Sequence, residues 1–293
     1  FDGIAGLSDR TWRVTDMSDA KIPIAGVIGH PIAHSKSPKL HGHWLTTYGI
    51  KGHYVPLDVA PDDFAAVIRT LPKMGFVGTN VTIPHKENAI EIADVVSEHA
   101  ALIGAANTLV FDKDGKIHAD NADGYGFIAN LKQNAPNWQP KAGPAKVFGA
   151  GGAARAIIVS LLDEGVPEIL LSNRTKARAE VLKEEFGTRI SVVDWEDAGD
   201  ALGNATTVVN TTSLGMVGHA EFSVPLEMLR ADAVVTDIVY APLRTPFLET
   251  AATAGCVTVD GLGMLLHQAV PGFERWFGVR PEVNDDLRKA VLA

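Results

Sequence analysis

The chain has 293 residues with 46% hydrophobic and 21% charged side chains, proportions typical of a globular protein and sufficient for two domains. Its formal net charge of -9 argues against a nucleic-acid-binding protein, because phosphate backbones are bound by clustered Lys and Arg. Cys256 is the only cysteine, so no internal disulfide can form and a reducing compartment is expected. No run of about eighteen apolar residues occurs, and we expect no membrane span.

The start of the chain is unusual for a natural N-terminus. It opens with Phe1 and reaches its first methionine at Met17, so we interpret residues 1–16 as an upstream or cloning remnant. No cationic segment followed by an apolar one is present, and we expect no secretory signal. These features predict a cytoplasmic protein without nucleic-acid or membrane partners, and we expect a monomer or homodimer that acts on a small molecule.

In the first half of the chain, short apolar runs alternate with stretches in which apolar residues recur at helical spacing. Ser37-Pro38 predicts a helix start, with Ser37 as N-cap and proline at the first helical position. Asp114-Gly115 predicts the turn of a hairpin. Strands are predicted at residues 22–28, 54–59, 75–83, 108–111 and 117–119, and helices at residues 37–48, 61–71 and 86–96.

A stretch rich in Pro, Asn, Gln and Gly, residues 130–145, predicts a junction, after which the alternation restarts. Strands are predicted at residues 146–148, 169–172, 190–193, 208–210, 234–238 and 257–259, and helices at residues 153–163, 176–186 and 264–277. Alternation of this kind is typical of an α/β fold with mainly parallel strands. We predict two α/β domains with a cleft between them.

A glycine-rich turn, GAGGAA at residues 149–154, lies between a predicted strand and a predicted helix. In a G-x-G-x-x-A pattern the first glycine permits a tight turn, the second lets the backbone approach a pyrophosphate, and the third position allows close packing. Such turns also serve plain packing, but the complete strand–turn–helix–strand order favours a dinucleotide site. We expect the contacts from Gly149, Ala150, Gly151, Gly152 and Ala153.

The residues after the following strand distinguish NADP from NAD. An NAD site usually has Asp or Glu there to bind the ribose 2′-hydroxyl, whereas this chain has Asn173-Arg174-Thr175 and then Arg178. Two guanidinium groups can bind a 2′-phosphate through bidentate hydrogen bonds. A solvated helix start with surface arginines is the alternative, but the position after the strand favours NADP as the cofactor.

Polar side chains gather where the strands of the first half end. Ser35 and Ser37 place two hydroxyls beside a helix N-terminus, which suits a carboxylate or ring hydroxyls, although a simple N-cap at Ser37 is an equally good interpretation. Asn80 and Thr82 alternate along a strand end and so face the same side. Lys86 stands at a predicted helix start, where the helix dipole disfavours a cation.

Two further polar turns, GAANT at residues 104–108 and NADG at residues 121–124, contain Asn107 and Asp123. Asn and Asp beside glycine are ordinary turn formers, so neither turn is informative alone. Lys86 together with Asp123 would supply a proton-transfer lysine and a carboxylate that orients it. We therefore predict these two residues as a catalytic pair.

Four histidines, His30, His34, His41 and His43, lie close together in the sequence. They straddle a loop and a helix without the pair at i, i+4 backed by an acid that is typical of a zinc site on a helix. We interpret them as loop and surface residues and expect no metal.

In their order along the chain, these motifs resemble the shikimate dehydrogenase family over residues 22–281. The matching stretches are GHPIAHSKSP at 29–38, NVTIPHK at 80–86, GAANT at 104–108, NADG at 121–124, the glycine turn, NRT at 173–175 and DGLGMLLHQA at 260–269. The resemblance implies a substrate-binding domain of residues 17–122, to which residues 262–293 return, and an NADP-binding Rossmann domain of residues 123–261.

The resemblance also implies an activity, the NADPH-linked reduction of 3-dehydroshikimate to shikimate in chorismate and aromatic amino acid biosynthesis. By motif, Ser35 and Ser37 resemble a carboxylate-binding pair, and Lys86 and Asp123 resemble the catalytic pair. The other implied substrate contacts are Asn80, Thr82, Asn107, Tyr240 and Gln268. The implied cofactor contacts beyond the glycine turn are Asn173, Arg174, Thr175, Arg178, Thr211, Met216 and Gly261.

The chain departs from the family pattern at Ala122, where the family usually has Thr between Asn121 and Asp123. This difference alters local hydrogen bonding and spares the aspartate. Ser37, rather than Thr, resembles the shikimate-specific members more than the quinate-using ones. A quinate/shikimate dehydrogenase of broader specificity and a non-catalytic ligand-sensing module are the two alternatives, and the presence of Lys86 with its aspartate counts against the second.

Overall fold

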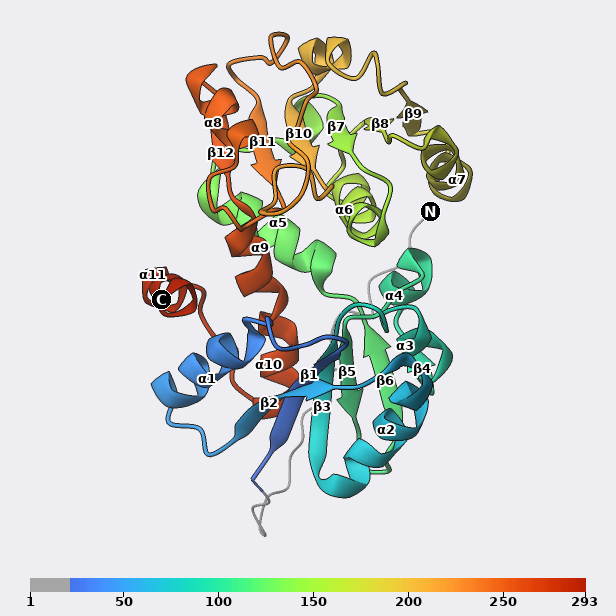
Figure 1. Ribbon diagram of the computed structural model, residues 1–293, viewed down its shortest axis with the longest axis vertical. Helices are drawn as coiled ribbons and strands as arrows, with labels where there is room; N and C mark the ends of the chain where they lie inside the picture. The colour runs from blue at the N-terminus through green and yellow to red at the C-terminus, as the bar shows by residue number, and fades with distance from the viewer. Residues whose placement is uncertain (1–21) are drawn as a thin grey trace, which may run out of the picture. The chain divides into compact units, whose positions relative to one another are not determined.

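The computed structural model describes residues 22–293, and these fall into two units (Figure 1). Unit 1 contains the described residues up to Asp120 together with Val270–Ala293, and unit 2 contains Asn121–Ala269. Each unit holds one six-stranded sheet, which confirms the predicted α/β class with two domains. Residues 1–16, interpreted above as a remnant, lie outside the described residues.

The unit boundaries differ from the predicted ones. The sequence placed the first boundary after residue 122 and the return of the chain at residue 262, whereas the structure divides after Asp120 and at Val270. The later return has a physical cause, because helix α9 (Gly261–Gln268) packs along helix α5 (Asp123–Asn134) within unit 2. The stretch 130–145 is not a junction, since it lies inside unit 2.

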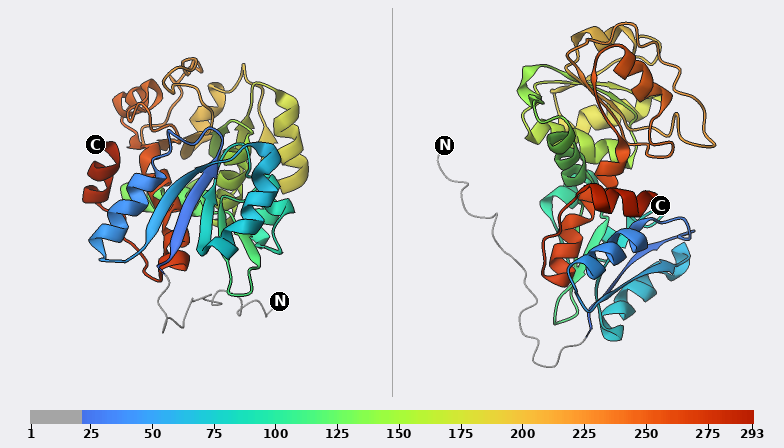
Figure 2. Two further views of the ribbon diagram at one scale, coloured as in Figure 1. Left: turned by 60° about the horizontal axis from the view of Figure 1, so that its bottom comes forward. Right: turned by 90° about the vertical axis from the view of Figure 1, so that its left-hand side faces the viewer.

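The sheet of unit 1 is mixed, with the strand order β2-β1-β3-β5-β6-β4. β1 pairs in parallel with β2 and β3, which puts the carboxyl ends of these three strands at one edge (Figure 2). β5 and β6 form the predicted hairpin, and β5 is antiparallel to β3. The strands are β1 (Ile24–Gly29), β2 (His53–Asp58), β3 (Phe76–Val81), β4 (Val95–Val96), β5 (Thr108–Phe111) and β6 (Ile117–Asp120).

The helices of unit 1 come from both ends of the chain. α10 packs against β3 and β5, where Nε1 of Trp276 donates to the Leu109 carbonyl (3.0 Å), and α11 packs against α1 (Figure 1). The predicted helix 86–96 is wrong, because only one turn forms and the β-branched Val95–Val96 then pairs with β6. The helices are α1 (Ser37–Thr47), α2 (Phe64–Thr70), α3 (Asn88–Glu91), α4 (Glu98–Ile103), α10 (Val270–Phe277) and α11 (Asp285–Leu292).

An aromatic cluster joins α1, β2 and α10. The ring of His41 stacks on Tyr54, with 3.8 Å between ring centroids and 6° between ring planes, and it also meets Trp44, Phe273 and Trp276. All five rings are buried, and burying a side chain of this size stabilises a fold by roughly 2 kcal/mol. The cluster therefore fixes the middle of α1 against the sheet.

The sheet of unit 2 is wholly parallel, with the order β12-β11-β10-β7-β8-β9. If β7 is numbered 1 and the sheet is read from β9 to β12, the order is 3-2-1-4-5-6, which is that of dinucleotide-binding folds. Such folds bind their ligands where the strand order reverses. Here the reversal falls between β7 and β10. The strands are β7 (Ala145–Phe148), β8 (Ile169–Ser172), β9 (Ile190–Val192), β10 (Thr207–Asn210), β11 (Val234–Asp237) and β12 (Val257–Val259).

Helices cover both faces of this sheet. The adjacent Val147 and Phe148 of β7 belong to different apolar clusters, so the two clusters lie on opposite faces. The predicted helix 264–277 forms as two helices that part at Ala269, where the following Pro271 cannot donate to the turn before it. No helix among residues 22–293 is long and apolar enough to cross a membrane. The remaining helices are α6 (Gly152–Asp163), α7 (Lys176–Phe186) and α8 (Pro246–Thr253).

Candidate active site

The loop between β1 and α1 carries the two predicted serines. The N-cap of α1 is Lys36 and Ser37 is already helical, so the predicted N-cap role of Ser37 is wrong. The Oγ atom of Ser35 accepts a hydrogen bond from the backbone N–H of Ser37 (3.3 Å), which holds both serines at the N-terminus of an 11-residue helix. An anion placed there would meet the positive end of the helix dipole.

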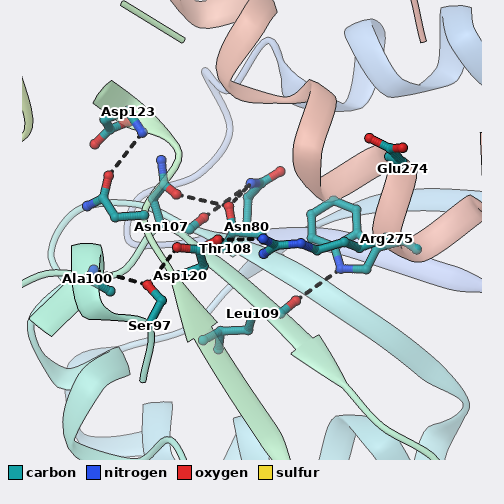
Figure 3. A network of polar contacts seen from close by, with 12 residues as sticks. Asn80, Ser97, Ala100, Asn107, Thr108, Leu109, Asp120, Asp123, Glu274 and Arg275 are labelled. Carbon is teal, nitrogen blue, oxygen red and sulfur yellow. Dashed lines mark hydrogen bonds and ion pairs between the residues drawn. The ribbon is translucent and has the colours of Figure 1, made fainter. Parts of the chain in front are cut away.

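Asn80, at the end of β3, is buried and its amide is engaged inside unit 1 (Figure 3). Its Oδ1 accepts from the Tyr54 hydroxyl (2.6 Å), and its Nδ2 donates to the Asn107 carbonyl (3.2 Å) and to Thr108 Oγ1 (3.4 Å). Burial raises the pKa of Tyr54 well above its usual value, and a hydrogen bond with Ser37 partly opposes that shift. These bonds join Asn80 to the neighbouring strands, and its predicted contact with the substrate stays a prediction.

Asn107 is held from three strands. Its backbone N–H donates to the Asp120 carbonyl (3.0 Å), its own carbonyl accepts from the N–H of Val81 (2.9 Å), and its Oδ1 accepts from Thr108 Oγ1 (2.9 Å). Thr82 directly follows β3, and its backbone N–H bonds to β1 (2.9 Å). The side chains of Asn107 and Thr82 thus start from the ends of two adjacent strands, β5 and β3.

The chain leaves unit 1 at Asp120, and its carboxylate is held on both sides (Figure 3). Oδ1 accepts from Ser97 Oγ (2.7 Å), and Oδ2 forms an ion pair with Arg275 of α10 (2.7 Å). Ser97 also caps α4, because its Oγ accepts from the N–H of Ala100 (3.1 Å). These contacts fix the end of β6 and therefore the backbone that positions Asn107.

Lys86 is half-buried in the loop that precedes α3, so it does not open a long helix as predicted. Its carbonyl accepts from the N–H of Ala106 (2.8 Å). The adjacent His85 is buried, its ring stacks on Phe64 at 4.4 Å, and its Nε2 bonds to the Val59 carbonyl (2.8 Å). The sequence reasoning missed this anchor, whose only signal is its place beside the lysine.

Asp123 opens α5 in unit 2 and is buried (Figure 3). Its backbone N–H donates to Asn121 Oδ1 (3.0 Å), which satisfies one of the free N–H groups at the helix start. A Cβ on Gly126 would lie 2.7 Å from the backbone N of Gln268, so the start of α5 and the end of α9 approach closely. Asp123 and Gln268 therefore lie at the same end of this helix pair. Lys86 belongs to unit 1, and its pairing with Asp123 is a proposal.

The glycine turn fits a dinucleotide. Gly149 has φ +106, and a Cβ there would lie 2.5 Å from Thr211 Oγ1, so only glycine allows this turn. A Cβ on Gly151 or Gly152 would meet nothing within 4 Å, which leaves open space beside the backbone. Gly151 is the N-cap of α6 and offers no side chain, so the first N–H groups of a 12-residue helix can bind a pyrophosphate.

Asn173 connects the glycine turn to the loop that begins α7. Its Oδ1 accepts from the N–H of Ala150 (3.1 Å), and its Nδ2 donates to the Thr175 carbonyl (2.8 Å). Arg174 and Arg178 are exposed, and neither forms an ion pair with any residue in the range 22–293. Two guanidinium groups next to the end of β8 are therefore available to a phosphate.

A buried network at the ends of β10 and β11 escaped the sequence reasoning. Oδ1 of Asp237 accepts from Asn210 Nδ2 (3.0 Å) and from the N–H of Val239 (3.0 Å), and Oδ2 accepts from Thr245 Oγ1 (2.7 Å). Oδ1 of Asn210 accepts from the N–H of Thr212 (3.0 Å). Burial raises the pKa of Asp237 to about 6, against the effect of its hydrogen bonds. The network fixes the loops that follow both strands.

The other predicted residues of unit 2 lie after the carboxyl ends of its strands. Thr211 follows β10, and its Oγ1 donates to the Phe148 carbonyl (2.6 Å). Met216 lies in the same loop, and Tyr240 lies after β11, where burial raises the pKa of its hydroxyl. Gly261 opens α9 after β12, where a Cβ would overlap the Ile238 carbonyl. In a parallel sheet these ends share one edge with the glycine turn.

The histidines around α1 do not gather at one point. His30 pairs with Asp58 (2.6 Å), whereas His41 is wholly buried in the aromatic cluster, which corrects its interpretation as a loop or surface residue. Burial lowers the pKa of His41 to about 3, an effect that the Asn80 side chain opposes slightly. Among the described residues no group of three or more His, Cys, Asp or Glu could hold a metal ion.

Three family models match this chain. They are the Shikimate dehydrogenase substrate binding domain at residues 27–109, Shikimate / quinate 5-dehydrogenase at residues 132–224 and the Shikimate 5′-dehydrogenase C-terminal domain at residues 261–291. A curated relative, Shikimate dehydrogenase (NADP(+)) from Cereibacter sphaeroides strain ATCC 17025, is 67% identical over 273 residues, which are 93% of this chain and 98% of the relative.

Solved structures are similar over the same length. Shikimate 5-dehydrogenase from Thermus thermophilus, in complex with NADP(H) and shikimate, is 36% identical with a TM-score of 0.82, covering 93% of this chain and 99% of that chain. Quinate dehydrogenase from Corynebacterium glutamicum, in complex with NAD, is 30% identical with a TM-score of 0.86, covering 92% and 99%. The chain belongs to the shikimate dehydrogenase family.

Proposed function

We propose that this chain catalyses the reversible NADPH-linked reduction of 3-dehydroshikimate to shikimate, a step of chorismate and aromatic amino acid biosynthesis. The observation that carries the proposal is the 67% identity over 273 residues to a relative named shikimate dehydrogenase (NADP(+)). Both units fit it. Unit 1 gathers hydroxyl and amide groups at strand ends. Unit 2 has a dinucleotide turn beside two arginines that form no ion pair within residues 22–293.

The substrate is a ring that carries one carboxylate and several oxygens. Ser35 and Ser37 bind the carboxylate at the positive end of α1. Asn80, Thr82 and Asn107 contact the ring and its oxygens from adjacent strand ends, and Asn80 also donates to the Asn107 carbonyl. Tyr240 and Gln268 complete the contacts from unit 2.

Reduction of a ring ketone needs a hydride and a proton for the alkoxide that develops. NADPH, when bound, supplies the hydride. The Lys86 ammonium donates the proton to the ketone oxygen, directly or through a water, and recovers it from solvent. Asp123 accepts a hydrogen bond from a neighbouring substrate hydroxyl and orients the ammonium group by charge.

The cofactor is bound by unit 2. The backbone of residues 149–153 holds the pyrophosphate, and Asn173, Arg174, Thr175 and Arg178 surround the phosphorylated ribose. Thr211, Met216 and Gly261, after neighbouring strand ends, contact the nicotinamide end.

A four-way steady-state assay tests the proposal, with shikimate and quinate as substrates and NADP and NAD as cofactors. We expect kcat/KM to be highest for shikimate with NADP. Comparable values with quinate would support the second candidate, a broader quinate/shikimate dehydrogenase, which the likeness to a quinate dehydrogenase favours. No turnover with any of the four combinations would contradict an oxidoreductase and support a ligand-sensing module.

We further propose that the enzyme works in the cytoplasm as a monomer or homodimer. The single cysteine, Cys256, is buried and free, which suits a reducing compartment. Sedimentation equilibrium of the purified protein distinguishes the two oligomeric states, and a larger assembly would contradict both.

A further inference from the structure

Lys146 of β7 is a wholly buried lysine for which the proposed reaction has no role. Its Nζ donates to Ser172 Oγ (2.5 Å) and lies 5.1 Å from the centre of the Phe148 ring. No carboxylate among residues 22–293 pairs with it. A buried cation is expensive without an anion, so this position needs an explanation.

The side chain extends along β7 toward the cofactor loops. Lys146 pairs with Leu170 in the register of β7 and β8, yet its Nζ reaches Ser172, the last residue of β8. The Ser172 carbonyl accepts from the N–H of Gly149 (2.8 Å). Ser172 is therefore bonded to the glycine turn and directly precedes Asn173 and Arg174. The ammonium group lies beneath the point where the two cofactor loops meet.

We propose that Lys146 is a specificity-determining residue for the cofactor, a buried third cation that favours NADP over NAD through its charge beneath the 2′-phosphate loop. This inference rests on the proposed 2′-phosphate site at Arg174 and Arg178. It assigns Lys146 no direct contact with the cofactor. Two charges interact more strongly through a protein interior than through water. A 2′-phosphate bound at this loop would therefore supply the anion that Lys146 lacks.

Without the cofactor Lys146 is only partly protonated near neutral pH, because burial lowers its pKa to about 7. Other charged groups on the surrounding elements do not fix the protonation state of Lys146. Asp194, beyond β9, is paired with Lys176 of α7 (2.6 Å), and Arg155 of α6 is paired with Glu185 (2.5 Å). Other charged residues on the neighbouring elements are Arg174 and Arg178 after β8, Glu196, Asp197 and Asp200 between β9 and β10, and the buried Asp237 on β11. A bound phosphate dianion raises the pKa of Lys146, so NADP binding takes up a proton and NAD binding does not.

The test compares cofactor affinities of the full-length wild type and of Lys146→Met, which keeps the length and apolar contacts of the stem. Titration by NADPH and NADH fluorescence should show NADPH binding weakened about three- to tenfold, with NADH changed by less than about twofold. Ser172→Ala, which removes the hydrogen bond and keeps the charge, should retain the preference for NADPH. Equal losses for both cofactors, or no loss, would overturn the proposal.

Proton uptake on NADP binding can be measured by calorimetry of the wild type, so this second test does not depend on the folding of any variant. NADP binding at pH 7.5 in two buffers of different ionisation enthalpy should show uptake of about half a proton, as expected when a pKa near 7 rises by about one unit. The 2′-phosphate, with a pKa near 6, contributes little at this pH. No uptake would overturn the proposal. The double variant Arg174→Ala, Arg178→Ala tests the parent site separately. An unchanged NADPH preference there would contradict the proposed 2′-phosphate site and with it the inference, whereas a lost preference there beside an unchanged preference in Lys146→Met would overturn the inference alone.

Discussion

The two units form their parts of the site from different chemical groups. Unit 2 relies on the backbone, with a left-handed glycine, free N–H groups at a helix start and exposed arginines. Unit 1 relies on side chains, because Asn80, Asn107 and Thr108 hold one another through amides and a hydroxyl. A backbone site is specified by a few local residues, whereas a side-chain site depends on partners far apart in the chain.

The buried ionisable groups follow the same division. Unit 1 buries the aromatic His41 among other rings, where its neutral form is favoured. Unit 2 buries Lys146 and Asp237 near the edge of the sheet that carries the cofactor loops. Unit 1 therefore buries a neutral ring for packing, whereas the buried Lys146 of unit 2 is the charge that we propose responds to the cofactor.

The largest expected effect comes from the side chain that carries the chemistry in unit 1. Lys86→Ala should lower kcat by about 10² to 10⁴, the usual contribution of a general acid, and leave the NADPH dissociation constant unchanged. The measurement is single-turnover kinetics beside fluorescence titration of NADPH. Lys73→Ala, at an exposed lysine of the same unit, is the matched control and should keep full turnover. Near-normal turnover of Lys86→Ala would remove Lys86 from the mechanism.

The next effect probes the backbone site of unit 2. Gly149→Ala forces a side chain into a left-handed turn against Thr211 Oγ1, so we expect a loss of about 1 to 3 kcal/mol in stability and little NADPH binding. Gly151→Ala is the matched control, since its Cβ meets open space at φ -94. It should keep its thermal midpoint and still bind NADPH poorly, because the methyl group takes the place of the pyrophosphate. A Gly151→Ala enzyme with normal affinity would contradict the assigned pyrophosphate site.

The contrast between the units also explains what could be predicted from sequence. The strands of unit 2 were predicted to within one residue at each end, because short buried apolar runs alternate there with helices. The helix predicted at 86–96 failed because β4 needs a partner strand that local spacing cannot show. The bonds from Tyr54 to Asn80 and from Asn210 to Asp237 each span more than twenty residues. Such pairs exist only once the sheet has formed.

A smaller effect is expected from the support beneath the unit 1 site. Tyr54→Phe leaves Oδ1 of the buried Asn80 without its 2.6 Å donor, which should cost about 1 to 3 kcal/mol of stability. Misplacement of Asn107 should then raise KM for shikimate while NADPH affinity stays unchanged. Tyr48→Phe is the control, because that hydroxyl accepts from the backbone of Glu282 at the surface. An unchanged KM in Tyr54→Phe would mean that Asn80 does not position the site.

The smallest effects come from pH, and they have opposite signs in the two units. Folded His41 has a pKa of about 3 against 6.5 when unfolded, so the unfolded chain binds more protons and unit 1 loses stability as pH falls below 6.5. Folded Asp237 has a pKa of about 6 against 3.8, so the folded chain binds more protons and unit 2 gains stability as pH falls from 6 toward 3.8. Each change amounts to about 1 kcal/mol between pH 6 and pH 5.

Native-state hydrogen exchange of the β1 and β10 amides measures each unit separately. Other groups titrate in the same range, so the decisive quantity is the difference between the wild type and a variant without the buried group. His41→Phe should remove only the loss in β1, and Asp237→Asn should remove only the gain in β10. If either variant changed the pH response of both strands equally, the two buried groups would not act within their own units. The two units would then unfold with a single free energy, and the contrast between a rigid substrate unit and a responsive cofactor unit would not hold.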